Sequence, residues 1–147
     1  MSPAEQSEIV DMLEKSREDF RAAVAGLSES LAATRPEAER WSVLECVEHV
    51  ATVEDIFLKR LASGEHKETT PEDRAKEAAI AHRIVDRSSR RQAPETVLPK
   101  GRFTSLPEGL EPFEGARSRS LQSARPRTAD QSTPASMPPA SQAQNGV

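Results

Sequence analysis

The sequence predicts an all-α fold, a bundle of helices packed side by side, followed by a disordered C-terminal tail. Two observations predict the helices: serine or threonine residues that suit a helix N-terminus precede four segments, and apolar residues recur in those segments at helical spacing. A third observation predicts the tail, because from Gln122 to Val147 the chain has no leucine, isoleucine or aromatic residue. Such a segment cannot bury enough apolar surface to offset roughly 1–2 kcal/mol per residue of lost backbone entropy. We therefore expect a helical domain over residues 1–121 and a disordered, low-complexity tail over residues 122–147.

The first helix is predicted from about residue 3 to about residue 33. Ser2 is a candidate N-cap, a proline follows it at the first helical position, and Glu5 can close a capping box. Gly26 weakens this helix modestly, and Arg35-Pro36 ends the pattern. The apolar repeat consists of Ile9, Leu13, Phe20, Val24, Leu27 and Leu31, with Ser16 at the same spacing.

The second helix is predicted to begin at Ser42, where Glu45 can complete a capping box, and to end before Gly64. Its central apolar stripe consists of Val43, Val47, Val50, Phe57 and Leu61. Further apolar residues flank this stripe on both sides, so the helix should contact at least two neighbours, as in a bundle. The residues of the remaining narrow polar arc are Glu45, Glu48, Thr52, Asp55 and Lys59.

Two further helices are predicted in the second half of the chain. One begins at Thr70 and runs to about Ser89, with a thin apolar face made mostly of alanine. Residues 92–104, which contain two prolines and Gly101, should form an extended connection. The other helix begins at Ser105 and keeps its apolar pattern up to Leu121.

Composition limits the functions that this chain can have. A net charge of −4 gives no reason to expect nucleic acid as a partner. No apolar run approaches the roughly 18 residues of a membrane-spanning helix, and the acidic N-terminus is unlike a signal peptide, so we expect a soluble protein of the cytoplasm. Cys46 is the only cysteine, which excludes an internal disulfide and a multi-cysteine zinc site. We expect Cys46 to be a small buried hydrophobic residue and not a reactive thiol.

His49 is the main candidate for a functional residue, because it lies at the edge of the apolar arc of the second helix. It is either a metal ligand or a core-edge histidine satisfied by a hydrogen bond. Glu45, one turn earlier, either orients the imidazole or acts as a solvated capping carboxylate. His82 lies on the apolar side of the third helix, where it either approaches His49 or is a buried or capping residue, and His66 should be exposed in a connecting loop.

Glu54 occupies the face of the second helix that should be most buried. A buried carboxylate needs a partner, and either Arg102 or Arg117 could supply a bidentate one. We expect this pair to be structural. The sequence contains no arrangement of serine, histidine and acid and no glycine-rich phosphate loop, so hydrolytic and phosphoryl chemistry have no independent support.

Several of these residues together resemble a known family. In the second helix they are Trp41-Ser42, Glu45, His49 and Glu54, and beyond it they are the stretch APETVLPKGRF over residues 93–103, Phe113 and Arg117. This combination resembles the DinB-like superfamily of bacterial metal-binding four-helix bundles. The resemblance covers residues 3 to about 121.

The resemblance implies a divalent metal, often zinc or nickel. The family holds this metal with a histidine that matches His49 and with two more in a His-x-x-x-His arrangement on a late helix. That helix should follow residue 121, and no histidine stands there. We therefore expect an incomplete up-down bundle with a degenerate metal site, as a truncation or frameshift before the last helix would produce.

Three functional interpretations follow from this resemblance. In the first, the chain is a DinB-like metal-binding protein whose ligand His49 survives and whose activity is lost or reduced. In the second, it is a helical module for protein interaction or homodimerisation that holds no metal. In the third, it is a thiol-dependent transferase or hydrolase-like enzyme whose site is completed across a dimer, from His49 and either His82 or Glu45. A small-molecule thiol would be a substrate only if the family activity survives.

Overall fold

Helices make up all the regular structure in residues 2–64 and 68–126, which are the residues that the computed structural model describes. The elements are α1 (Pro3–Val24), α2 (Glu29–Ala33), α3 (Val43–Ala62), α4 (Pro71–Val85), the 3-10 turn η1 (Glu95–Val97) and α5 (Leu106–Ala124). No strand occurs in these residues. The predicted all-α fold is confirmed.

The four long helices begin at the capping residues that the sequence predicts. The hydroxyl groups of Ser2, Ser42, Thr70 and Ser105 each accept the N–H of the residue three positions later. In α1, α3 and α4 the acidic side chain at that later position accepts the N–H of the cap in return, which completes a capping box. In α5 the corresponding residue, Glu108, instead accepts from the backbone N–H and hydroxyl of Thr104 at 3.1 and 2.7 Å.

The prediction of one continuous helix from residue 3 to residue 33 was wrong. Gly26 adopts a φ of +75°, a left-handed conformation that ends α1. Ser28 then caps the separate short helix α2 by accepting the N–H of Leu31 at 3.2 Å. Gly64, also at +75°, ends α3 as predicted, whereas α4 ends at Val85 and not at Ser89.

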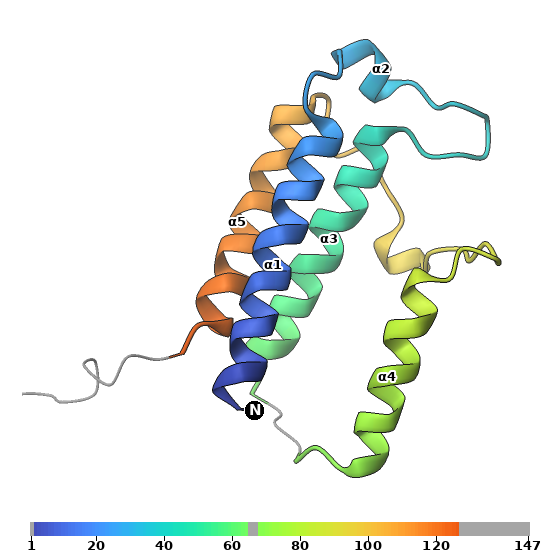
Figure 1. Ribbon diagram of the computed structural model, residues 1–147. Coiled ribbons are helices and arrows are strands. Elements are labelled where there is room, and N and C mark those ends of the chain that lie inside the picture. Colours follow the sequence, from blue (N-terminus) through green and yellow to red (C-terminus); the bar gives the residue numbers. More distant parts are fainter. Residues whose placement is uncertain (1, 65–67, 127–147) are drawn as a thin grey trace, which may run out of the picture.

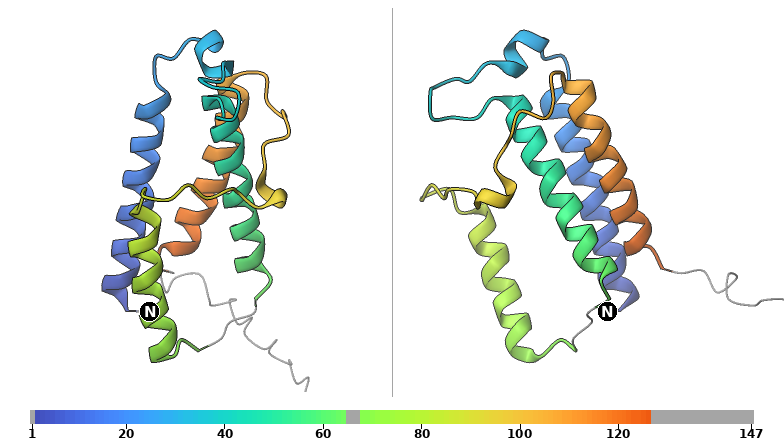
Figure 2. Two further views of the ribbon diagram at one scale, coloured as in Figure 1. Left: turned by 90° about the vertical axis from the view of Figure 1, so that its right-hand side faces the viewer. Right: turned by 180° about the vertical axis from the view of Figure 1, so that it is seen from behind.

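The long helices alternate in direction along the chain, as Figure 1 shows. In Figures 1 and 2, α1, α3 and α5 lie side by side, and α5 packs against both of the others. Phe113 of α5 is fully buried and its ring lies 4.3 Å from that of Phe20 of α1. The buried apolar residues are Val24, Ala32, Leu44, Val47, Ala51, Leu106, Phe113, Ala116 and Leu121. The core therefore lies among α1, α2, α3 and α5.

Helix α4 stands apart from this core (Figure 1). None of its residues is buried, and Ile84 and Val85 are 73% and 70% exposed. An ion pair of 3.0 Å between Arg74 of α4 and Glu5 links the starts of α4 and α1. On α3, the prediction that Phe57 and Leu61 belong to the core stripe was wrong. Each is 59% exposed, because no described element covers the C-terminal half of that stripe.

The end of α5 and the predicted tail meet near the limit of the described residues. Helix α5 continues to Ala124, three residues beyond Leu121. From position 127 onward the predicted tail lies outside the described residues. Within residues 2–64 and 68–126, no helix combines the length and the apolar character that crossing a membrane requires.

Candidate functional site

His49 projects from α3 toward the segment that contains η1. Its Nδ1 lies 2.8 Å from the carbonyl oxygen of Val97. A carbonyl oxygen only accepts, so Nδ1 carries a proton and donates, and in the neutral ring Nε2 carries the lone pair. The indole of Trp41 lies against the imidazole, with ring centroids 5.0 Å apart. The interpretation of His49 as a half-buried histidine with a hydrogen bond therefore agrees with this geometry, and its second nitrogen keeps its lone pair.

The residue before it, Glu48, holds the next part of the same segment. Its Oε1 accepts the backbone N–H of Lys100 at 2.7 Å, and its Oε2 accepts those of Gly101 and Arg102 at 3.1 and 3.2 Å. Glu48 is only 3% exposed. Glu48 belongs to the predicted polar arc of α3, but residues 100–102 cover it there and supply the donors. Helical periodicity alone cannot reveal donors that belong to a loop 52 to 54 positions away.

Glu45 is a capping carboxylate, as one of its two interpretations proposed. Its Oε2 accepts the N–H of Ser42 at 3.2 Å. The guanidinium of Arg35 pairs with it at 2.8 Å. The proton of the His49 ring goes to Val97 and not to Glu45, so Glu45 does not orient the imidazole.

The other candidate residues do not join His49. His82 is exposed in the last turn of α4, so the prediction that it is buried was wrong, and no hydrogen bond in the described residues shows it capping the helix or contacting His49. His66 lies outside the described residues. The prediction that Cys46 is buried was wrong, since Cys46 is exposed. Partial desolvation and the charge of Glu45 raise the pKa of its thiol above the ordinary value, so this cysteine is not an activated nucleophile.

The fit of a metal ion can be judged from these contacts. A metal-bound histidine usually donates its other ring N–H to a carbonyl or carboxylate, as His49 does to Val97. A catalytic zinc site, however, needs about three protein ligands and an open position. Within residues 2–64 and 68–126, no cluster of three histidine, cysteine or acidic residues could hold a metal. His49 therefore fits the role of one ligand, and the described residues do not complete a site.

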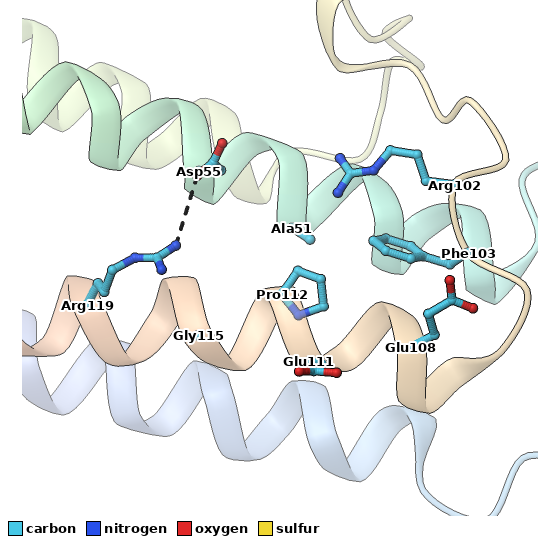
Figure 3. Close-up of a pocket in the computed structure, with 9 residues that line it drawn as sticks. All are labelled: Ala51, Asp55, Arg102, Phe103, Glu108, Glu111, Pro112, Gly115 and Arg119. Carbon is cyan, nitrogen blue, oxygen red and sulfur yellow. Dashed lines mark ion pairs between the residues drawn. The ribbon is translucent and has the colours of Figure 1, made fainter.

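A shallow groove of about 630 Å³ lies between α3 and α5 (Figure 3), and His49 is not among the residues that line it. Its lining residues are Ala51, Asp55, Arg102, Phe103, Glu108, Glu111, Pro112, Gly115 and Arg119. The guanidinium of Arg102 lies over the ring of Phe103 at 4.9 Å, and Arg119 faces Asp55 at 4.0 Å. Two cationic and three anionic side chains line the groove. This mixed charge selects no one class of ligand, and we assign the groove no chemistry.

Comparison with known proteins gives a match to a protein family. The family model described as the DinB superfamily matches residues 12–144, which is most of the chain. No curated protein and no solved structure matches it.

Proposed function

Because the chain belongs to the DinB superfamily, we propose that it is a metal-binding protein with a degenerate site, in which Nε2 of His49 is the surviving ligand. In this proposal its enzymatic activity is lost or much reduced. One observation carries the proposal: the hydrogen bond from Nδ1 of His49 to Val97 leaves Nε2 with its lone pair, which is the form of the ring that binds a metal.

The number of ligands sets the strength of binding. Three imidazoles on a folded scaffold share one ordering cost, whereas a single imidazole competes with water unaided. Zinc or nickel, the metals that the resemblance implies, would therefore bind weakly to a site with His49 alone. We place the protein in the cytoplasm and propose neither nucleic acid nor a membrane as its partner.

A second candidate function is a helical module for homodimerisation or protein interaction. The observation that favours it is a set of exposed apolar side chains on α3 and α4. They are Phe57, Leu61, Ile80, Ile84 and Val85, each more than half exposed. Phe57 and Leu61 are four positions apart on α3, as are Ile80 and Ile84 on α4, so each helix has an exposed apolar face of the kind that interaction sites use. If such a dimer also completed the metal site, the protein would be an enzyme, and a small-molecule thiol would be its substrate.

Native mass spectrometry of the purified protein separates these functions, because it gives metal content and molar mass together. The proposal predicts a protein without stoichiometric metal. A metal-free dimer would support the interaction module in place of the metal site. A dimer that retains metal, and that loses it in His49→Ala, would contradict the degenerate site and support an enzyme assembled from two chains. The matched control is His82→Ala, which removes an exposed histidine from α4.

A further inference from the structure

We propose that Glu48 is a positioning residue, which sets the tautomer of His49 through residues 97–102. This inference deepens the proposed function, since it says how the lone pair of Nε2 is kept open. It rests on that function only in the assumption that the unprotonated Nε2 binds a metal. The tautomer itself can be measured without any metal.

The first step is the fixed relation between Glu48 and the loop. Both oxygens of a carboxylate that is 3% exposed accept N–H groups from three consecutive residues, Lys100 to Arg102. A buried carboxylate is stable only when such donors replace water, and consecutive N–H groups converge on one anion only in a particular loop conformation. Gly101 supplies the left-handed φ of +74° within that conformation. The carboxylate and the loop therefore hold each other in place.

The second step is that the same segment reaches the imidazole. Val97 lies three positions before Lys100 and closes the turn η1, in which its own N–H donates to the carbonyl of Pro94 at 3.0 Å. Its carbonyl then accepts from His49 at 2.8 Å. Glu48 and His49 are neighbours on α3, so two adjacent side chains hold the two ends of one short segment.

The third step is the effect on the ring. An imidazole in water exchanges its proton between the two nitrogens, and the hydrogen bond that one nitrogen makes decides the tautomer. The carbonyl of Val97 holds the proton on Nδ1 only while the segment stays at its present distance from α3. By holding residues 100–102, Glu48 keeps that carbonyl in place, and the proton of the neutral ring therefore stays on Nδ1.

The variant Glu48→Gln tests this inference in the full chain. The amide keeps the size of the side chain but places an NH₂ group against backbone N–H groups, so the loop loses acceptors. We expect long-range ¹H–¹⁵N spectra, taken where the ring is neutral, to show a single Nδ1–H tautomer in the unchanged protein. In Glu48→Gln they should show a mixture with the Nε2–H form. Asp55→Asn is the control: it makes the same chemical change on α3 at a carboxylate that pairs with Lys59, and it should leave the tautomer unchanged.

A second variant keeps the test decisive if Glu48→Gln does not fold. Gly101→Ala strains the loop through its positive φ, while the added methyl group meets no atom within 4 Å. It should shift the tautomer in the same direction. A ring that stays fully Nδ1–H in a folded Glu48→Gln or Gly101→Ala protein would overturn the inference. Tight stoichiometric zinc binding by the unmodified chain would contradict the proposed function and leave the tautomer result intact.

Discussion

Arg117 is the residue that joins the three packed helices. From α5 it donates through Nε to Glu54 of α3 at 2.7 Å, and through Nη1 to the carbonyl of Leu13 and the hydroxyl of Ser16 of α1 at 2.8 and 2.6 Å. The sequence predicts that Glu54 is buried and needs an arginine. It does not distinguish Arg117 from Arg102, because that choice depends on how α5 packs.

Removal of this arginine should be strongly destabilising. Arg117→Met leaves the Glu54 carboxylate among buried groups, and one of its oxygens already has no partner in the described residues. We expect the free energy of unfolding to fall by about 3–5 kcal/mol in urea denaturation. Arg119→Met, at an exposed position of the same helix, is the control and should change it by less than about 0.5 kcal/mol.

The double variant Glu54→Leu with Arg117→Met separates the charge from the shape of the pair. Replacement of both partners by apolar residues of similar volume is often neutral, because no charge is left buried. Recovery of most of the lost stability is the expected result. A double variant as unstable as Arg117→Met alone would show that the contacts to α1 matter more than the ion pair.

Single residues also show where sequence reasoning fails. Helical periodicity assigns each side chain to a face of its helix, but it does not say what covers that face. Glu48 lies on the predicted polar arc and is buried by a loop, whereas Cys46 and Phe57 were assigned to the apolar side and are exposed. The hydrogen bond of His49 to Val97 also depends on a segment outside α3, so the sequence of α3 alone could not predict it.

On α5, Gly109 lies close against α3 and the segment before α5. A Cβ atom there would lie 3.0 Å from Cγ1 of Val47 and 3.2 Å from the ring of Phe103. At Gly115, on the same helix, a Cβ atom would meet nothing within 4 Å. Helix α5 therefore has one glycine with no room for a methyl group and one with room for it.

Alanine substitutions at these two glycines should have opposite effects. Gly115→Ala should raise the free energy of unfolding by about 0.5–1 kcal/mol through helix propensity alone. Gly109→Ala gains the same propensity but crowds the interface, which typically costs about 1–3 kcal/mol, so we expect a net loss. Thermal or urea unfolding checks both changes. Stabilisation by Gly109→Ala equal to that by Gly115→Ala would contradict the close packing of α5 on α3.

The link between α1 and α4 should depend on pH. The pKa of Glu5 is lowered from 4.5 to about 2, first by the backbone N–H of Ser2 and then by the side chain of Arg74. Because the folded pKa is the lower one, the stabilisation is complete above about pH 4.5 and is lost as the pH falls through about 2. An NMR titration of the Glu5 carboxyl carbon should give that midpoint.

The variant Arg74→Ala is the control for this titration. The midpoint of Glu5 should rise in the variant but stay below 4.5, because the capping bond of Ser2 is the larger cause and remains. A midpoint near 4.5 in the unchanged protein would mean that neither contact forms in solution. An unchanged midpoint in Arg74→Ala would show that the ion pair with Arg74 does not lower the pKa of Glu5.

The helices themselves were largely predictable. Capping residues are local signals, so the starts of α1, α3, α4 and α5 follow from the sequence to the residue. The end of α3 at Gly64 was also predicted. Gly26 was taken as a weak point in one helix, although the same left-handed conformation makes it a stop signal, and Ser28 caps the helix that follows.

For the molecule as a whole, the all-α class was predictable, and so was the family to which the chain belongs. The position of α4 was not, because its thin alanine-rich face does not specify a partner. In the candidate site, His49 could be singled out from the sequence, but the segment that accepts its hydrogen bond could not. That segment joins α3 through backbone groups, which carry no sequence signature.

A zinc titration by calorimetry tests the central claim most directly, namely that His49 is a preset ligand in an otherwise unfinished site. The full chain should bind zinc weakly, and His49→Ala should change this little. A chimera that carries a helix with the His-x-x-x-His motif after Ala124 should bind one zinc tightly and lose it in His49→Ala. Two results would contradict the claim. One is tight stoichiometric zinc binding by the unmodified chain that His49→Ala abolishes. The other is zinc binding by the chimera that is unchanged in His49→Ala.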